Sequence, residues 1–245
     1  MLQVNDMEDP RFSIVIPARD EEKCIGRCIA SIREAAKPFG GQVEIIVALN
    51  RCTDRTGEIA GAQGAVICRD DSKNLARIRN AGAMHARGEV LATIDADSIM
   101  SENMLVEIDR SLRSGKYIGG GVMIYPERYS IGIVMFMLAM IPLVFIKGLA
   151  AGVFWCYRKD FEAIQGFDER LVTAEDIDFA ARLKAHGRKL GKRFGFLRKA
   201  YIVTSCRKFD HFGDWYLIRH PVTAWRAIRG RDQRIGDMFF YDFKH

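Results

Sequence analysis

The sequence predicts an α/β fold in which a mostly parallel, doubly wound central sheet is flanked by helices. Short apolar runs alternate with segments of helical periodicity through the first hundred residues. A polar stretch follows each apolar run, as expected for the loops of such a sheet. The 245 residues, 49% of them hydrophobic, can bury a substantial core in one large domain or two small ones.

The first half of the chain alternates predicted strands with predicted helices. Residues 1–10 are expected to form a flexible tail. Continuous apolar runs predict buried strands, and apolar residues at helical spacing predict helices that cover the sheet. The expected strands are residues 12–17, 43–49, 65–68 and 90–94, and the expected helices are residues 22–36, 56–62 and 74–86.

The loops that follow three of these strands are predicted to meet at one edge of the sheet. Ligands of open α/β sheets bind at the carboxyl ends of the strands, so loops 18–21, 50–56 and 95–97 should line one crevice. Asp95 and Asp97 follow a buried run with i, i+2 spacing and can converge on Mg²⁺ or Mn²⁺ carrying a diphosphate. The alternative is a polar turn at the strand end, because Asp favours turns.

The second half of the chain is more mixed. Ser101 is expected to open one helix, and Gly187 to end another. Three successive glycines let the backbone approach a ligand or another strand closely. The expected features are helices at residues 101–114 and 174–186, a strand at 152–157, a turn at 165–169 and the glycines at 119–121.

Residues 131–146 form a block of 16 residues without a charge, interrupted by Pro142. A helix that spans a bilayer needs about 20 apolar residues, so a full span is the least favoured interpretation. The block can instead be a buried helix of the core. A third interpretation is a helix in the membrane interface beside a lipid-linked acceptor.

Positive charge is concentrated late in the chain. The formal net charge is +6, whereas residues 182–234 carry 15 Lys and Arg against three Asp, a net charge of +12. Such a segment favours anionic partners, for example nucleotide diphosphates or anionic lipid head groups. The sequence has no zinc finger, no aromatic RNA-binding signature and no long basic run, which argues against nucleic acid as a partner.

The six cysteines indicate a reducing compartment. They show no C-x-x-C pairing and no other zinc spacing, so we expect reduced thiols. The first twelve residues contain early acidic side chains and no apolar core, unlike a signal peptide. We therefore expect a cytoplasmic protein, with the inner face of the membrane as a further location.

Five motifs in order resemble those of the family 2 glycosyltransferases, over about residues 12–187. They are IPARDEE, NRCTDRT, ARIRNAGAMHARGE followed by a strand and DAD, QGFDE, and AED before a helix. Three positions depart from the family pattern: Arg19 stands where an aromatic residue is usual, Asp20 where Asn is usual, and Asn50 where an acidic residue is commoner. The resemblance implies a single-domain GT-A fold and transfer of a sugar from a nucleoside diphosphate sugar to an acceptor hydroxyl, usually with inversion.

The resemblance also implies a donor site with Mn²⁺ or Mg²⁺ as cofactor. Asp97 would ligate the metal and Asp95 would lie near the ribose or the metal. Arg79 suits the diphosphate because its guanidinium matches phosphate oxygens, although it can equally be a surface cation of a helix. The full set of implied nucleotide-sugar residues is Pro17, Ala18, Arg19, Glu21, Asn50, Arg79, Asp95, Ala96, Asp97, Arg207 and Lys208.

Inversion needs a base that removes the acceptor proton, and Asp176 of the AED motif is the implied candidate, with Glu175 as its substitute. From its residue type alone, Asp176 is equally an ordinary acidic helix start. The segment VTSCRKF resembles one in small family members and implies that Arg207 and Lys208 close over the diphosphate. His211 is a candidate third metal ligand, although histidines have many other uses.

These inferences divide the chain into a tail at residues 1–10, a catalytic domain at 11–215 and a C-terminal amphipathic extension at 216–245. Within the domain, residues 11–100 would bind the nucleotide and residues 101–215 the acceptor. Two other functions remain open. A nucleotidyltransferase usually carries a glycine-rich basic loop after its first strand, and IPARDEE has no glycine. The second of these functions is that of a noncatalytic nucleotide-binding or membrane-associated module.

Overall fold

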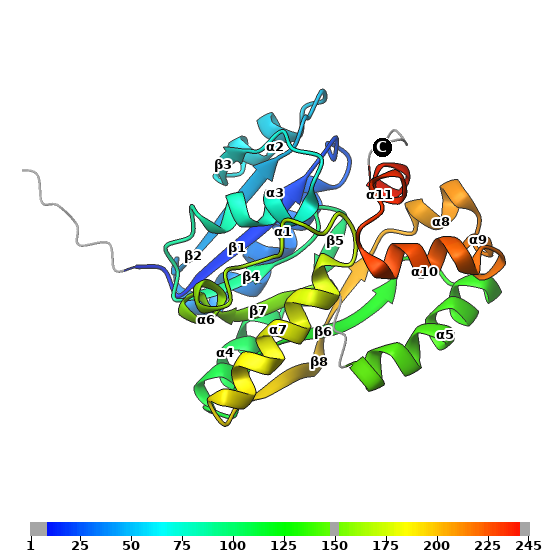
Figure 1. Ribbon diagram of the computed structural model, residues 1–245. Coiled ribbons are helices and arrows are strands. Elements are labelled where there is room, and N and C mark those ends of the chain that lie inside the picture. Colours follow the sequence, from blue (N-terminus) through cyan, green and yellow to red (C-terminus); the bar gives the residue numbers. More distant parts are fainter. Residues whose placement is uncertain (1–8, 148–151, 241–245) are drawn as a thin grey trace, which may run out of the picture.

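Eight strands form one sheet in the computed structural model, which describes residues 9–147 and 152–240 (Figure 1). The order across the sheet is β3-β2-β1-β4-β7-β6-β8-β5. The first four strands in this order are parallel, whereas β7 pairs antiparallel with both of its neighbours. The strands are β1 (Phe12–Ala18), β2 (Val43–Leu49), β3 (Val66–Arg69), β4 (Val90–Thr93), β5 (Ser98–Met100), β6 (Tyr117–Pro126), β7 (Phe154–Tyr157) and β8 (Arg193–Thr204).

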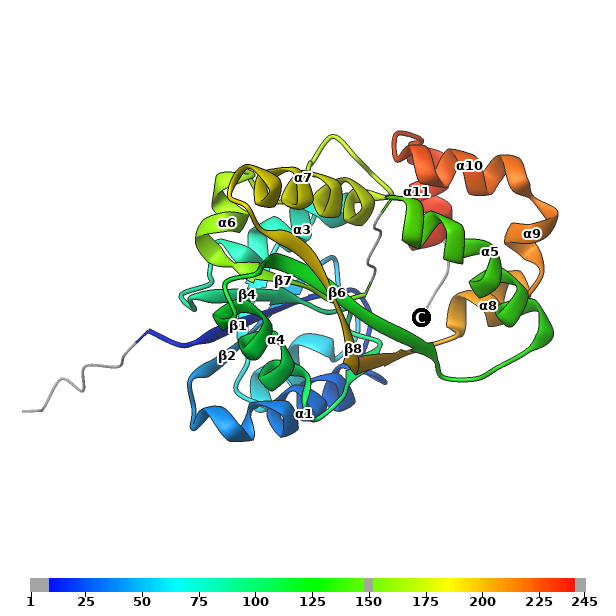
Figure 2. The same ribbon diagram turned by 90° about the horizontal axis from the view of Figure 1, so that it is seen from below.

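Helices cover both faces of this sheet (Figure 2). α1, α2 and α4 pack on one face, and α3, α6 and α7 on the other. Five further helices lie beyond the sheet. The bounds are α1 (Ile25–Ala36), α2 (Thr56–Ala62), α3 (Leu75–Ala83), α4 (Met104–Arg113), α5 (Ile131–Lys147), α6 (Arg158–Ala163), α7 (Glu175–Lys189), α8 (Arg207–Phe212), α9 (Tyr216–Arg219), α10 (Pro221–Arg229) and α11 (Gln233–Phe240), with a 3₁₀ turn at Lys37–Phe39.

Strand β1 lies at the centre of the parallel half, and all seven of its residues are buried. Successive side chains of a strand point to opposite faces, so Ile14 packs toward α1 and Val15 toward α3. The three successive glycines of β6 allow the neighbouring strand to approach closely, as the sequence predicts. A Cβ atom on Gly120 would lie 2.2 Å from the carbonyl oxygen of Gly195 in β8, so only glycine fits there.

The alternating elements of the first half are confirmed, with two predictions matching residue for residue, at 43–49 and 56–62. Four predicted helix boundaries are wrong by three residues each. α1 begins at Ile25 instead of residue 22, α3 ends at Ala83 instead of residue 86, and α4 begins at Met104 instead of residue 101. α7 continues through Gly187 to Lys189, because this glycine is buried against Ile118 inside the packed helix. The predicted C-terminal amphipathic extension at 216–245 is divided into three short helices over its described part, α9, α10 and α11.

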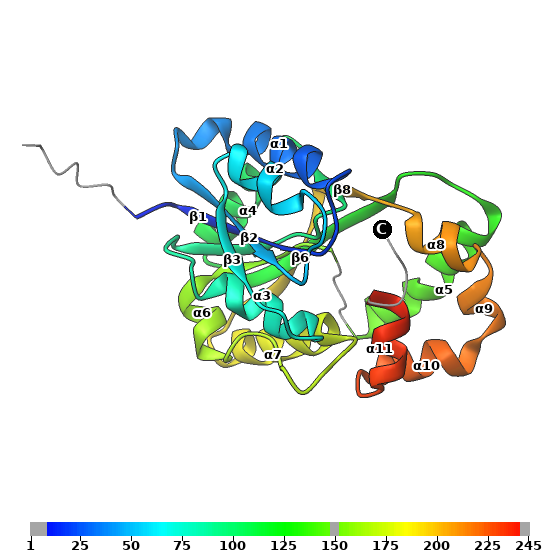
Figure 3. The same cartoon turned by 90° about the horizontal axis from the view of Figure 1, so that it is seen from above.

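The helices beyond the sheet form a separate layer, which we call the helical lobe: α5 and α8 to α11 (Figures 1 and 3). α5 contacts α8 through the rings of Phe136 and Phe209, whose centroids are 5.5 Å apart. It also packs Gly132 against Asp214. The lobe therefore joins an internal segment of the chain to its last helices.

The helical lobe tests two of the three interpretations of residues 131–146. α5 extends for 17 residues, roughly 25 Å, and no helix within the described ranges is long and apolar enough to cross a bilayer. A fully buried helix is also wrong for the part whose side chains are described, residues 131–139. There Ile131, Val134, Met135 and Leu138 are exposed.

Candidate active site

A hollow opens where β1, β2 and β4 end, as the sequence predicts. It is open to solvent on one side and takes in about 730 Å³ with its mouth included. Of the eleven residues predicted for the nucleotide-sugar site, ten line it and only Arg79 does not. The lining residues are Pro17, Ala18, Arg19, Glu21, Asn50, Leu75, Ile78, Asp95, Ala96, Asp97, Arg207, Lys208 and Phe239.

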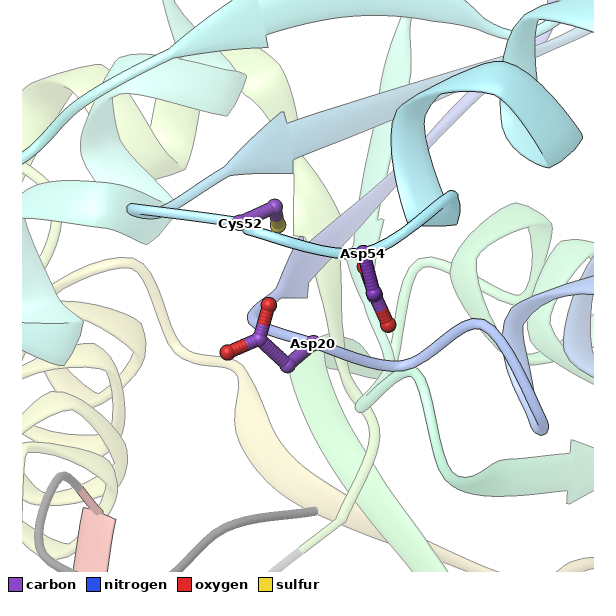
Figure 4. A group of neighbouring side chains, drawn as sticks. All are labelled: Asp20, Cys52 and Asp54. Carbon is purple, nitrogen blue, oxygen red and sulfur yellow. The ribbon is translucent and has the colours of Figure 1, made fainter.

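Two strand-end loops on the wall of this hollow are tied to each other by hydrogen bonds (Figure 4). Asp20 accepts a hydrogen bond from the Thr53 backbone N–H at 2.6 Å, and Asp54 accepts one from the Glu22 N–H at 2.9 Å. Asp20 adopts a left-handed backbone conformation with φ of 50°, which is strained for a residue with a side chain. The reciprocal bonds hold this strained loop in place.

Asp20, Cys52 and Asp54 also form an acidic group whose ligand atoms lie within 4.8 Å of one another (Figure 4). Burial raises the pKa of the Cys52 thiol, which favours the protonated form and weakens it as a metal ligand. Burial acts against ionisation of Asp54 as well, but hydrogen bonds from Thr56 and Glu22 outweigh it and lower the pKa of this carboxyl. The carboxylate oxygens of Asp20 and Asp54 are ligands that a cation can use, but they already accept hydrogen bonds that join the two loops.

Asn50 follows β2 and is buried at the pocket wall. Its side-chain nitrogen donates to the carbonyl oxygens of Asp70 and Ser72, at 2.6 and 2.7 Å. Two carbonyl acceptors fix the orientation of the amide, and among residues 9–147 and 152–240 the buried Oδ1 has no hydrogen-bond partner. A buried acceptor without a partner is costly, so this atom is suited to receive an N–H group from a ligand.

Two carboxylates on the pocket wall, Glu21 and Asp97, share one guanidinium. Arg207 donates to both carboxylate oxygens of Glu21 at 2.8 Å and contacts Asp97 at 3.2 Å. Burial raises the pKa of Glu21 to about 7 although Arg207 lowers it, and burial together with the charge of Asp95 raises the pKa of Asp97. The pocket thus concentrates negative charge that a cation would stabilise.

A second arginine lies behind the pocket. Arg79 is buried, pairs with Asp95 at 2.8 Å and also pairs with Glu175 at the start of α7. Its interpretation as a surface cation is wrong. Arg79 does not line the pocket. Because its guanidinium pairs with both carboxylates, it links the end of β4 to the first turn of α7.

The two acidic residues at the start of α7 have different surroundings. Glu175 is buried and its carboxylate is engaged by Arg79. Asp176 is half-buried and accepts a hydrogen bond from the N–H of Ile177 at 2.7 Å. Burial and the neighbouring charge of Glu175 raise the pKa of Asp176 to about 7, with Arg79 acting in the opposite direction. Asp176 is not among the pocket-lining residues, but the charges of Arg79 and Asp95 act on it.

The loop before α7 is held by the helical lobe. Gly230, which ends α10 with φ of 73°, accepts a hydrogen bond from the Val172 N–H at 2.8 Å. A Cβ atom on Gly230 would lie 2.4 Å from the Thr173 carbonyl oxygen, so the contact requires glycine. Phe239 of α11 completes the pocket lining. The last helices therefore touch both the pocket and the loop that positions Asp176.

Two further outcomes concern the predicted residues. His211 lies exposed on α8 and does not line the pocket. Within residues 9–147 and 152–240, Asp95, Asp97 and His211 do not come together as a group of three close ligand atoms. Three lining residues were missed: Leu75, Ile78 and Phe239. Leu75 and Ile78 belong to α3, whose apolar residues the sequence assigned to packing against the sheet. Phe239 was missed because nothing in the sequence places α11 beside the first strand.

Comparison with known proteins identifies the family. Residues 13–158 match the model of the family described as "Glycosyl transferase family 2". The chain belongs to this family. One curated member, the low-salt glycan biosynthesis hexosyltransferase Agl6 of Haloferax volcanii, is 32% identical over 106 residues, 43% of this chain and 25% of Agl6. The chain thus spans about a quarter of the length of that relative.

Solved structures show the same fold, which confirms the GT-A architecture. TarS of S. aureus, residues 1–349 in complex with UDP-GlcNAc, has a TM-score of 0.65 at 17% identity, covering 95% of this chain and 71% of that one. The mannosyltransferase PcManGT of Pyrobaculum calidifontis, in complex with GDP-Man and Mn²⁺, has a TM-score of 0.64 at 17% identity, covering 90% and 65%. At these identities the likeness concerns the fold.

Proposed function

We propose that the protein is a metal-dependent glycosyltransferase that transfers a hexosyl group from a nucleoside diphosphate sugar to an acceptor hydroxyl, with inversion. The observation that carries the proposal is the pocket itself. It gathers the ends of three parallel strands around one open hollow, which is lined by three carboxylates and three basic side chains: Glu21, Asp95, Asp97, Arg19, Arg207 and Lys208. In an open α/β sheet this is the place where ligands bind.

The donor nucleotide is assigned to the wall formed by the ends of β1 and β2. Pro17, Ala18, Arg19 and Glu21 line this wall, and Asn50 offers its buried Oδ1 to an N–H group of the base. Uracil and guanine both carry a ring N–H. TarS and PcManGT were solved with UDP-GlcNAc and GDP-Man, which makes these two the first donors to test.

The diphosphate is assigned to the opposite side of the pocket, between the aspartates and the basic residues of α8. Arg207 and Lys208 line this side and suit phosphate oxygens. Asp95 and Asp97 fit a divalent cation, because hard cations prefer carboxylate oxygens and the crowded charge of this wall favours one. The bound Mn²⁺ or Mg²⁺ would neutralise charge on the departing diphosphate.

Asp176 is assigned as the general base and Glu175 as a residue that positions Arg79. In the proposed step, the acceptor oxygen attacks the anomeric carbon, the bond from that carbon to the diphosphate breaks, and Asp176 takes the acceptor proton. A base with a pKa of about 7 suits this task near neutral pH. Glu175 is less suited, because its carboxylate is engaged by buried Arg79.

Family membership decides against the nucleotidyltransferase alternative, and the presence of both Asp97 and Asp176 argues against a noncatalytic module. The six cysteines, all free thiols, support a cytoplasmic location.

The test is a screen of UDP-GlcNAc, GDP-Man and other nucleoside diphosphate sugars with and without Mn²⁺. We expect slow, Mn²⁺-dependent release of one free nucleoside diphosphate, because water substitutes for the acceptor. If no donor in the screen is hydrolysed and none binds in a metal-dependent manner, the proposal is wrong.

A further inference from the structure

The outer side of the helical lobe carries an exposed apolar stripe on α5. Ile131, Val134, Met135 and Leu138 are spaced i, i+3, i+4 and i+7, which places them on one side of the helix. Ile131 is 77% exposed and Leu138 52%. The buried Ile133 and half-buried Phe136 face the rest of the protein instead, so over residues 131–139 α5 is packed on one side and exposed on the other.

Helix α10 presents a second exposed stripe, which combines two apolar and two basic residues. Val222, Trp225, Arg226 and Arg229 also follow the i, i+3, i+4, i+7 spacing and are all exposed, Val222 at 62% and Trp225 at 52%. The Arg229 guanidinium lies over the Trp225 ring, 3.7 Å from its centroid. The exposed Ile218 and Arg219 of α9 repeat this pairing of an apolar side chain with an arginine.

We propose that the helical lobe is a docking surface for an anionic lipid bilayer. Exposed tryptophan beside arginine is the composition that settles at the boundary between head groups and acyl chains. The basic side chains complement the negative surface of such a bilayer, where each contributes about a fivefold gain in binding. The exposed apolar side chains stand beside the exposed Arg219, Arg226 and Arg229, and an anionic bilayer offers both the apolar layer and the negative charge that complement them.

The docking surface lies close to the proposed donor site. α8, which belongs to the lobe, supplies Arg207 and Lys208 to the pocket, and Gly230 at the end of α10 contacts the loop before α7. A lobe seated on a bilayer would therefore hold the pocket beside the lipid surface. This proposal does not depend on the proposed function, because binding to lipid is measured without any sugar donor.

The experiment is cosedimentation of the full chain with vesicles of phosphatidylcholine alone, or of phosphatidylcholine with one third phosphatidylglycerol. We expect binding to the anionic vesicles that weakens as salt is added, and little binding to the neutral ones. Arg226→Ala combined with Arg229→Ala should weaken binding about thirtyfold. Leu138→Glu should weaken it about tenfold, because the side chain loses its place in the apolar layer.

Matched controls lie on the opposite part of the molecule. Arg188→Ala with Lys189→Ala removes the same charge from the exposed end of α7, and Met84→Glu places an acid at an apolar position that is 86% exposed after α3. Both controls should bind vesicles like the wild type. Circular dichroism and thermal unfolding confirm that every variant folds.

Three results would overturn the proposal. The first is that the wild type does not sediment with anionic vesicles. The second is that lobe variants and controls lose binding equally, which would reflect net charge alone. The third is a dimer in light scattering that Leu138→Glu dissociates, because a second copy of the chain would then cover the stripe.

Discussion

At the scale of single residues, the site is a set of carboxylates with different tasks. Asp97 and Glu21 both pair with Arg207, and Asp95 and Glu175 both pair with Arg79. Among the contacts of the described residues, Asp176 pairs directly with neither arginine. These five acids come from three segments far apart in sequence. The pKa values of Glu21, Asp97 and Asp176 are all raised, mainly by burial, and arginine charges oppose the rise in each.

Asp97→Asn should abolish metal-dependent nucleotide binding and reduce transfer to background. The amide keeps the shape of the side chain but removes the charge that the cation needs. Titration calorimetry with UDP or GDP, with and without Mn²⁺, measures the effect. Glu34→Gln, which removes an exposed carboxylate at the far end of α1, is the matched control and should change nothing. Unchanged metal dependence in Asp97→Asn would remove the assigned role.

Asp176→Asn should lower kcat by about 10² or more and leave nucleotide affinity nearly unchanged, since general base catalysis is worth that much. In the wild type, kcat should rise with pH up to about 7 and then level, because only the ionised form of Asp176 accepts a proton. This rising limb should be absent from the residual activity of the variant. Equal losses of binding and turnover would point to a structural carboxylate instead.

The same substitution should stabilise the fold at high pH. The pKa of Asp176 is raised from 3.8 to about 7, so the folded state holds the proton more tightly than the unfolded chain does. The resulting contribution to stability is complete below about pH 4 and is lost as the pH rises through about 7. Asp176→Asn should therefore gain of order 1 kcal/mol at pH 8 and little at pH 4. Urea unfolding at the two pH values tests this, and a loss of stability at pH 8 would contradict it.

At the scale of elements, the start of α7 combines a strained backbone with the candidate base. Ala174, the residue before the helix, has φ of 56°, a left-handed conformation that a residue with a Cβ rarely adopts. The preceding Val172 and Thr173 are held by α10 through Gly230 and the carbonyl oxygen of Ala227. Strained residues persist where the surroundings fix them, and here the lobe does so.

Ala174→Gly should therefore raise the free energy of unfolding, or leave it unchanged, because glycine adopts this φ without strain. Ala181→Gly, at an exposed position inside the same helix, should lower it by about 0.5–1 kcal/mol, the ordinary effect of glycine in a helix. Denaturant unfolding of the two variants gives the comparison. Equal destabilisation of both would mean that Ala174 is not strained.

At the scale of the whole molecule, the positive charge of the late segment is brought against the acidic ends of the early strands. Arg207 and Lys208 follow β8, which pairs with β5, and so they reach the wall that Asp97 occupies. The pocket is thus assembled from both ends of the described chain. Ligand binding should stabilise the fold as a unit, since no single element contains the site.

UDP or GDP should raise the melting temperature only when Mn²⁺ or Mg²⁺ is present. At a ligand concentration one hundred times Kd, the gain is about 2.7 kcal/mol, which corresponds to roughly 5 °C or more in a chain of this length. Thermal unfolding with nucleotide alone, metal alone and both together separates the contributions. A shift of equal size without any divalent cation would contradict the proposed metal dependence.

The sequence by itself determined the alternation of strands and helices in the first half and the meeting of three loops at one edge. It could do so because hydrophobic periodicity and the rules of parallel sheets are local or topological. Asp95, Asp97, Glu21 and Asn50 follow strands that must end together, so their convergence was predictable. The family motifs then extended the expectation to Arg207 and Lys208.

Only the tertiary structure decided what these side chains contact. It paired Arg79 with Glu175 behind the pocket, carried α7 past Gly187, exposed one side of α5 and brought Phe239 to the end of β1. Such contacts depend on packing between elements that are distant in sequence. A charge or an apolar block has the same sequence signature whether it is buried, paired or exposed, and only its neighbours in space make the difference.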